Sequence, residues 1–292
     1  MKNIEKTSLA KLKMTVSMTI FGTIGIFVHY IPLPSSILAL VRGIIGMLFL
    51  LLVVTVTKKK ISFEAIKNNG LVLLLSGTAI GINWILLFEA YRYTTVATAT
   101  LCYYLAPVFV VLISPLILKE KLTVKKGICS AVALGGMILV SGVLETGVHN
   151  SNGCLGILFG VGAAFFYATV VLLNKKLKNI SAYDRTMVQL GVAAIVLLPY
   201  ALLTETVDLN TLSPTVIVLV LIVGIVHTGA AYALYFGSMK DLKAQTIAIF
   251  SYIDPVVAIL LSAVLLQQGL GLTGIIGAVM ILGATFVSEL TT

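Results

Sequence analysis

Charged side chains are scarce in this chain. Only 11% of its 292 residues are Asp, Glu, Lys or Arg, and 59% are apolar, whereas a soluble globular protein carries about 25% charged residues. So few polar side chains do not cover the surface that a folded domain of this length exposes to water. The composition therefore excludes a soluble or disordered protein and predicts one that is embedded in a lipid bilayer.

Motifs that hold metals, nucleotides or catalytic nucleophiles are also missing. The sequence has no GxxxxGK[ST], HExxH or GxSxG pattern, and its three cysteines and three histidines lack metal-ligand spacing. The net charge is +9, but Lys and Arg do not cluster with aromatic residues as in nucleic-acid-binding proteins. We therefore expect no metal, no cofactor, no nucleic-acid partner and no enzymatic activity.

Apolar stretches long enough to cross a bilayer occur ten times. A helix needs about 20 mostly apolar residues to span the hydrocarbon core. The ten stretches run approximately over Met14–Ile31, Ile37–Thr57, Gly70–Tyr91, Val96–Leu118, Gly127–Leu144, Cys154–Leu173, Thr186–Leu203, Thr215–Gly237, Gln245–Leu266 and Leu270–Ser288. The sequence thus predicts an all-α integral membrane protein with ten transmembrane helices.

The distribution of basic residues predicts how these helices are oriented. When the connecting loops are assigned alternately to the two sides, eighteen of the twenty Lys and Arg residues fall on one side. Arg92 alone falls on the other side, and Arg42 lies within the second stretch. Because basic loops stay in the cytoplasm, we expect both termini to be cytoplasmic and the protein to lie in the plasma (inner) membrane.

The two halves of the sequence resemble each other. Shifting the chain by 148 places pairs residues 70–140 with 218–288 without a gap. The pairs that are least expected by chance are Gly81/Gly229, Phe88/Phe236, Thr98/Thr246, Tyr104/Tyr252, Pro107/Pro255, Ser114/Ser262 and Gly135/Gly283. Self-similarity over such a distance indicates a duplicated structural unit. We expect a basic N-terminus (1–13), a first five-helix repeat (14–144), an extracytoplasmic linker (145–153) and a second repeat (154–289).

Five helices is an odd number, so the second repeat must enter the membrane from the opposite side. The charges agree, because the basic loop Lys119–Lys126 corresponds to the uncharged segment Gln267–Gly274. Inverted repeats are typical of secondary transporters, whose substrate site lies near the midplane between the halves. A duplicated membrane protein that transports nothing, or that scrambles lipids, remains an alternative at this stage.

Several segments resemble one known family. They are Phe88-Glu-Ala-Tyr-Arg-Tyr-Thr-Thr, Tyr104-Leu-Ala-Pro107-Val-Phe-Val, Lys119-Glu-Lys-Leu-Thr123 and Gly135-Gly136, with Asp254-Pro255-Val and Gln267-Gln-Gly-Leu in the second copy. Together they resemble the EamA branch of the drug/metabolite transporter superfamily. The resemblance implies two inverted five-helix repeats and transport of small organic molecules, often efflux. The acidic residue after the fourth helix is present as Glu120, whereas its repeat partner is Gln268.

Two helix faces are the best candidates for the walls of a substrate site. A proline inside a span removes a backbone hydrogen bond and kinks the helix, and Pro107 and Pro255 occupy matching positions. Polar side chains that share a helical face with them are Thr100, Tyr103, Tyr104 and Ser114 in the fourth span and Ser251, Tyr252 and Ser262 in the ninth. Contacts between helices are an equally good explanation for any one of these residues.

Asp254 stands out, because a carboxylate in the middle of a span costs about 2.5 to 3.5 kcal/mol on insertion. Such a residue is expected to face a cavity, where it binds a proton or a substrate amine. The alternative is an ion pair with Arg42 that only fixes helix packing. Arg42 itself is a candidate ligand for a substrate carboxylate, and snorkelling to the outer surface is the competing interpretation.

Three further residues complete the candidate site. Trp84 pairs with Tyr232 in the repeat, and both are able to stack on a planar or cationic substrate. Glu89 lies near the outer end of the third span and is a candidate counter-ion, although a solvated carboxylate near Arg92 is the competing interpretation.

We therefore expect a secondary transporter, an exporter, for a small metabolite such as an amino acid or amine. It would work by alternating access at a central cavity, with proton coupling as one option for its energy source. Its partners would be a small-molecule substrate and the lipid bilayer, and a homodimer is compatible with the sequence.

Overall fold

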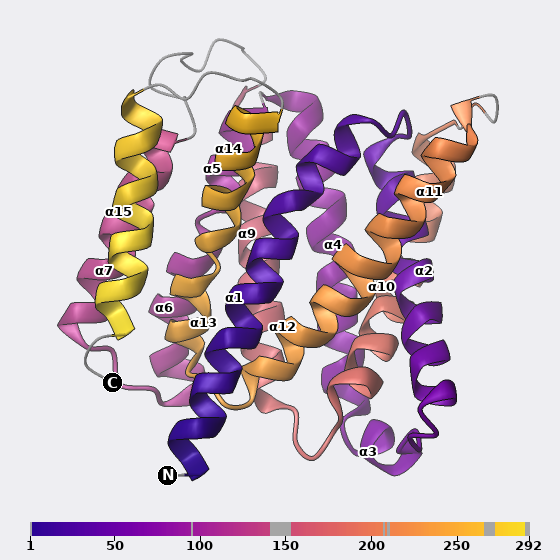
Figure 1. The fold of residues 1–292 in the computed structure, drawn as a ribbon, viewed down its shortest axis with the longest axis horizontal. Coiled ribbons are helices and arrows are strands. Elements are labelled where there is room, and N and C mark those ends of the chain that lie inside the picture. The colour runs from indigo at the N-terminus through magenta and orange to yellow at the C-terminus, as the bar shows by residue number, and fades with distance from the viewer. Residues whose placement is uncertain are drawn as a thin grey trace.

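The computed structural model describes residues 2–94, 96–140, 153–206, 208, 211–265 and 272–289. Within these ranges the chain forms helices and turns but no β-strand (Figure 1). The helices are α1 (Lys2–His29), α2 (Ser35–Val56), α3 (Phe63–Asn68), α4 (Gly70–Tyr93), α5 (Val96–Tyr103), α6 (Ala106–Leu118), α7 (Val124–Val140), α9 (Gly153–Lys176), α10 (Ala182–Thr204), α11 (Pro214–Ile222), the π-helix η2 (Val223–Ala230), α12 (Ala231–Met239), α13 (Ala244–Phe250), α14 (Ile253–Leu265) and α15 (Leu272–Glu289).

These helices make ten membrane crossings, as the sequence predicts. In the described chain, seven segments are long and apolar enough to span a bilayer: α1, α2, α4, α5–α6, α9, α10 and α11–α12. The shorter apolar helices α7, α13–α14 and α15 complete the ten. Both chain ends lie at the same end of the bundle, together with the additional short helix α3 (Figure 1). We refer to it as the basic end, because the Lys-rich loops are there.

The contacts between helices reveal an approximate two-fold axis. Helix α4 packs against α9 and α10. The crossing equivalent to α4 in the second repeat packs in the same way, with α12 against α1 and η2 against α2. Likewise, the packing of α5 and α6 on α9 matches that of α14 on α1. Three pairs are formed by equivalent crossings and lie on the axis itself. They are α2 with α10, the fourth crossing with the ninth through α6 and α13, and α7 with α15. The fold is therefore two inverted five-helix repeats.

Two crossings are interrupted at equivalent places. Helical geometry is lost at residues 104–105, between α5 and α6, and at residues 251–252, between α13 and α14. Pro107 and Pro255 follow in the first turns of α6 and α14, where the missing N–H of a proline is not needed. Each proline thus begins a new helix after a break, instead of bending one continuous helix as expected.

The eighth crossing contains a second irregularity, the eight-residue π-helix η2. π-Helices are rare and usually short. Here the hydroxyl of Thr228 donates to the carbonyl of Val223, five residues earlier, at 3.0 Å. A Cβ on Gly224 would lie 2.5 Å from Ile45 of α2, so the close approach of η2 to α2 requires glycine.

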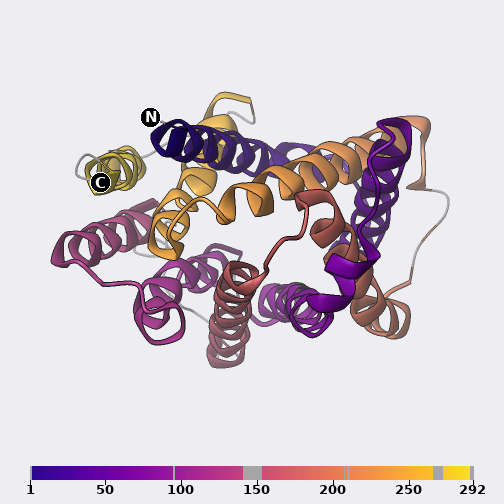
Figure 2. The same cartoon turned by 90° about the horizontal axis from the view of Figure 1, so that it is seen from below.

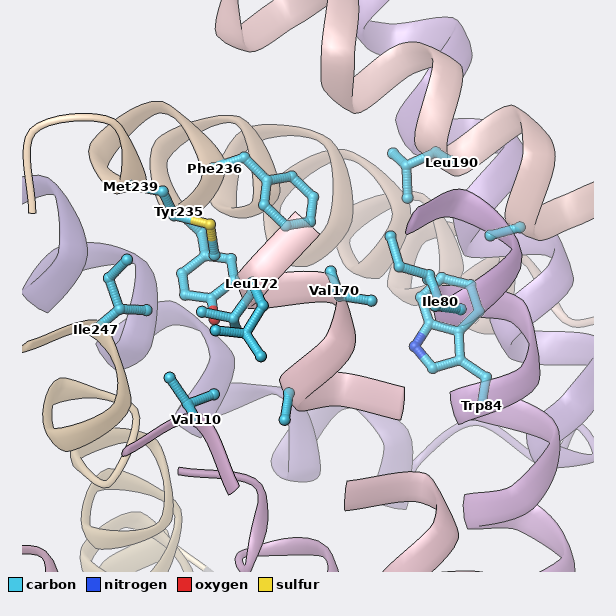
Figure 3. Packing of buried hydrophobic residues seen from close by; sticks show 14 of the residues in the cluster. Ile80, Trp84, Val110, Val170, Leu172, Leu190, Tyr235, Phe236, Met239 and Ile247 are labelled. Atoms are coloured by element: carbon cyan, nitrogen blue, oxygen red, sulfur yellow. The ribbon is translucent and has the colours of Figure 1, made fainter. Parts of the chain in front are cut away.

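In the part of the chain that the structure describes, three clusters of buried side chains join the two repeats, and two of them lie next to the candidate site. In the larger cluster, Tyr235, Phe236 and Met239 of α12 gather with Leu172 of α9 and Val110 of α6 (Figure 3). The smaller cluster joins α7 and α15, which stand side by side at one edge of the bundle (Figure 2). The larger cluster includes Met18, Trp84 and Tyr235, which also line the cavity described next.

Candidate functional site

A cavity of about 300 Å³ lies inside the bundle, where both repeats contribute walls. It is lined by Met18, Phe21, Gly22, Ile24 and Gly25 of α1, Arg42 of α2, Trp84, Leu87, Phe88 and Tyr91 of α4, Thr100, Tyr103, Tyr104, Ala106 and Pro107 around the α5–α6 break, Tyr167 of α9, Tyr232 and Tyr235 of α12, and Ser251, Asp254 and Ala258 around the α13–α14 break. We call it the central cavity.

The central cavity lies on the two-fold axis, because equivalent residues of the two repeats line it in pairs. Four pairs separated by 148 places contribute to the wall: Trp84/Tyr232, Leu87/Tyr235, Tyr103/Ser251 and Ala106/Asp254. The side chains in each pair differ, so the duplicated backbone encloses a chemically asymmetric space. The single acidic side chain of the lining comes from the second repeat, and the single basic one comes from the first.

Most of the wall is aromatic. The Tyr167 and Tyr235 hydroxyls are hydrogen-bonded at 2.5 Å, and the Tyr103 ring meets the Tyr167 ring edge to face with centroids 5.7 Å apart. Trp84 meets Tyr232 in the same way at 6.4 Å. Such rings offer both an apolar face and a hydroxyl or indole N–H at the rim. The cavity is thus suited to a small molecule with an apolar body and a few polar groups.

Arg42 and Asp254 both line the central cavity but form no ion pair with each other, within the part of the chain that the structure describes. The Arg42 guanidinium instead lies over Trp84, with Cζ 4.7 Å from the ring centroid. Asp254 lies in the first turn of α14, where the positive end of the helix dipole favours its carboxylate. Both charged groups therefore remain available to a ligand.

The position of Asp254 is fixed by a close helix crossing. A Cβ added to Gly22 of α1 would lie 2.6 Å from the carbonyl oxygen of Asp254 and 2.6 Å from Cβ of Val257. These distances are well inside van der Waals contact, so α1 and α14 meet backbone to backbone here. The absence of a side chain at Gly22 sets how far Asp254 reaches into the central cavity.

Several of the predicted site residues that the structure describes are absent from the lining of the central cavity, among them Ser114 of the first polar face. Ser262 of the second polar face lies outside the residues whose side chains the structure describes. Tyr252 is fully buried in the smaller cluster, and its hydroxyl donates to the Tyr104 carbonyl at 3.2 Å. Pro255 is buried in the first turn of α14. Glu89 accepts hydrogen bonds from Arg92 and from the Tyr200 hydroxyl, in a network that joins α4 to α10. Arg42, Trp84, Thr100, Tyr103, Tyr104, Pro107, Tyr232, Ser251 and Asp254 do come together at the cavity.

Polar contacts between the repeats close the bundle at the basic end. Glu120 accepts from the Ala244 backbone N–H at 2.9 Å, Lys126 Nζ donates to the Thr246 hydroxyl at 3.1 Å, and Gln245 donates to Ser114 at 3.3 Å. We call this set, which binds the α6–α7 region to the start of α13, the clasp. Val110 follows Pro107 by one turn of α6, Ile247 precedes Ser251 by one turn of α13, and Met239 follows Tyr235 by one turn of α12. All three are buried in the larger cluster (Figure 3).

Sequence reasoning missed several wall residues, notably Tyr167 and Tyr235. Tyr235 had a usable signal, because it lies one turn after Tyr232 and is the repeat partner of a residue one turn after Trp84. Tyr167 had no such signal, since its crossing has no matched polar face in the other repeat.

Ten crossings in two inverted repeats, with a polar aromatic cavity on the axis between them, define a protein of the membrane-transporter class. The chain belongs to the EamA-like transporter family, whose model matches residues 9–142 and again residues 154–290. Several of its relatives are named as uncharacterized transporters, in keeping with a non-enzymatic protein. A membrane-embedded transporter interacts with the lipid bilayer and with a small-molecule substrate.

Comparisons with individual proteins agree with this family assignment. The chain is 35% identical to the uncharacterized transporter YxxF of Bacillus subtilis over 278 residues, which is 95% of this chain and 88% of that one. It is 30% identical to an uncharacterized transporter of Archaeoglobus fulgidus (68% and 69% of the two chains) and 28% identical to the protein PecM of Dickeya dadantii (74% and 72%). One solved crystal structure matches with a TM-score of 0.85 at 18% identity, covering 96% and 97% of the two chains, and supports the fold alone.

Proposed function

We propose that this protein is a secondary transporter that exports a small amine or amino acid across the plasma membrane, with both termini in the cytoplasm. The observation that carries the proposal is the central cavity, in which one carboxylate and one guanidinium face a common aromatic space without pairing. Its volume of about 300 Å³ is at the small end of the range for small-molecule sites.

The two charged groups suggest how such a substrate is held. A substrate ammonium would bind the Asp254 carboxylate, and an amino acid would place its carboxylate on Arg42. The apolar part of the substrate would then lie against Trp84, Tyr103 and Tyr232, where cations and rings also stack favourably. A simple amine would use Asp254 alone, so the two substrate classes differ in their dependence on Arg42.

Asp254 is also our candidate for proton coupling. When it binds a proton, it loses the charge that holds an ammonium group, so proton and substrate compete for one carboxylate. Competition of this kind exchanges an outgoing cation for an incoming proton. Because the sequence contains no nucleotide-binding loop, the proton gradient or substrate exchange is the energy source that we propose.

Alternating access would occur by rocking of the repeats, residues 14–144 and 154–289, about the two-fold axis. In the proposed cycle, the arrangement in which the clasp is formed is the state closed at the basic end. Opening that end requires the three hydrogen bonds of the clasp to break. The neutral one contributes about 0.5–1.5 kcal/mol, and the two that involve Glu120 and Lys126 contribute about 1.5–3 kcal/mol each. A barrier of this size is readily offset by substrate binding, which makes the clasp a suitable reversible gate.

Uptake into proteoliposomes tests the proposal. Labelled amino acids and polyamines would be offered with and without a pH gradient, and we expect saturable, protein-dependent accumulation that the gradient accelerates. Asp254→Asn should abolish the effect of the gradient, whereas Glu64→Gln, which removes an exposed carboxylate on α3, should not. An Asp254→Asn protein that is folded and retains full gradient-driven transport would refute the coupling role.

A fluorescent phospholipid in the same vesicles distinguishes the alternative. If the protein accelerates movement of that lipid between leaflets but accumulates neither amino acids nor amines, it is a scramblase and the proposed function is wrong.

A further inference from the structure

A second and larger cavity, of about 670 Å³, lies at the basic end of the bundle. It is bounded by α1, α2, α12 and the segment that leads into α10. On α12 it uses Ala233 and Gly237, whereas Tyr232 and Tyr235 of the same helix face the central cavity. Helix α12 therefore separates the two cavities, and the proposed transport function does not account for the second one.

The second cavity is strongly basic. Its lining includes four basic side chains, Lys6, Lys13, Arg185 and Lys240, and a single acidic one, Asp241. Lys6, Lys240 and Asp241 are exposed at its mouth, which places the positive charge where the bundle meets water. A site of this composition attracts anions.

Arg185 is the main evidence that this cavity binds a ligand. The residue is only 2% exposed, and its Nε atom is buried without a hydrogen-bond partner. No ion pair to Arg185 is present among the residues that the structure describes. Its neighbour Asp184 accepts from the backbone N–H of Ser62, at 3.5 Å, rather than from Arg185. Asp241, which lines the same cavity, attracts Arg185 electrostatically but forms no ion pair with it in the described chain. A buried guanidinium without a hydrogen-bonded anion is costly, so the geometry leaves a place for an anionic oxygen that accepts from Nε.

Most of the remaining wall of the second cavity is apolar, although the hydroxyl residues Ser181 and Ser238 also line it. The apolar part includes Leu9 of α1, Phe49 and Val53 of α2, and Leu234 of α12. Leu9 is 51% exposed, so the apolar wall continues onto the outer surface of the bundle, where lipid chains lie. A soluble anion has no apolar part that could pack against this wall. A phospholipid would place its headgroup at the basic mouth and its acyl chains along the wall.

We propose that the second cavity binds one anionic phospholipid from the leaflet at the basic end. The phosphate oxygens accept hydrogen bonds from Arg185 and from Lys13, and the acyl chain packs between α1, α2 and α12. The lipid thus neutralises Arg185 and joins the N-terminal half of α1 to α12.

Lipid retention measured by native mass spectrometry tests this proposal without any transport measurement. The full-length protein in detergent would be incubated with equal amounts of phosphatidylglycerol and phosphatidylcholine. We expect one phosphatidylglycerol to be retained in preference to phosphatidylcholine. Arg185→Gln and Lys13→Gln should each weaken that retention by about fivefold, the usual effect of one basic residue near an anionic lipid surface. Lys67→Gln, which removes a charge on exposed helix α3 at the same end, is the matched control and should retain the lipid as the wild type does.

Lys13→Gln keeps the proposal testable if Arg185→Gln does not fold, because Lys13 lies only partly buried on α1. The proposal is overturned if both lipids are retained equally, or if Lys67→Gln loses as much phosphatidylglycerol as the two cavity variants. If the true ligand is a free anion, two results are expected. Millimolar inorganic phosphate alone would raise the melting temperature of the lipid-free wild type but not that of Lys13→Gln, and native mass spectrometry would show no preference for phosphatidylglycerol. Together these results would also overturn the lipid site.

Discussion

The contact between α1 and α14 allows a prediction with its own internal control. Gly22 and Gly25 both line the central cavity on α1, but only Gly22 is pressed against α14. The Cβ of Gly22→Ala would lie 2.6 Å from the Asp254 carbonyl and from Val257, whereas the Cβ of Gly25→Ala would have no neighbour within 4 Å. The first substitution must push the two helices apart by about 1 Å to restore van der Waals contact, and the second requires no movement.

The expected energies follow from these distances. Overpacking a close contact costs about 1–3 kcal/mol. Gly22→Ala should lower the free energy of unfolding by this amount, because the atoms that its Cβ meets are a backbone carbonyl and a Cβ that cannot rotate away. Gly25→Ala should be neutral or more stable by up to about 1 kcal/mol, because alanine is the better helix former. Helix α14 carries Asp254, so Gly22→Ala should also reduce transport in the folded fraction.

Thermal unfolding of the purified proteins in one detergent measures the first effect, and proteoliposome uptake at equal folded protein measures the second. The melting temperatures should fall in the order Gly25→Ala, wild type, Gly22→Ala. If Gly22→Ala melts with or above Gly25→Ala and transports like the wild type, then α1 and α14 are not in backbone contact and the placement of Asp254 is wrong.

Other substitutions test the rest of the site. Trp84→Leu removes the ring beneath Arg42. It should raise the KM for substrate by about 2- to 30-fold, the range of a cation–π interaction of about 0.5–2 kcal/mol. Trp84→Phe should recover most of the loss, and equal KM values for the two variants would contradict the stacking. Glu120→Gln weakens the clasp, because a neutral acceptor replaces the carboxylate on the Ala244 N–H. It should speed thiol labelling of a Val110→Cys reporter in a background without native cysteines, and an unchanged labelling rate would contradict a gating role. Tyr167→Phe removes one partner of the Tyr235 hydroxyl and should lower the melting temperature, by the loss of a buried hydrogen bond worth about 1 kcal/mol; an unchanged melting temperature would show that this bond contributes nothing.

The fold was largely predictable, because the bilayer imposes a length on every apolar helix and the repeat fixes which helices are equivalent. What the sequence did not reveal depends on local packing. Helix α3, which is capped by Ser62, has only six residues. A helix of this length is too short to be recognised from a pattern of apolar residues. The π-helix η2 depends on how closely Gly224 approaches α2, and no pattern within η2 itself encodes that distance.

The candidate site was predictable where both repeats carry a polar face. A helical wheel singled out Tyr104 and Ser251, and both line the central cavity. Asp254, which was singled out by its charge in mid-span, lines it as well. The wheel put Tyr252 on the same face as Ser251, because a wheel assumes an unbroken helix, whereas Tyr252 lies in the break between α13 and α14 and turns toward α7. Glu89 has its carboxylate in a network with Arg92, in line with the interpretation of it as an outer-surface carboxylate.

Helix α12 forms a wall of both cavities, and this shared wall has a thermodynamic consequence. A displacement of α12 toward one cavity reduces that volume and enlarges the other, so the occupants of the two spaces do not bind independently once the helix moves. Linkage then requires reciprocity: the factor by which a lipid in the second cavity changes substrate affinity equals the factor by which substrate changes lipid affinity. The composition of the membrane would in this way become a variable in the binding equilibrium of the substrate.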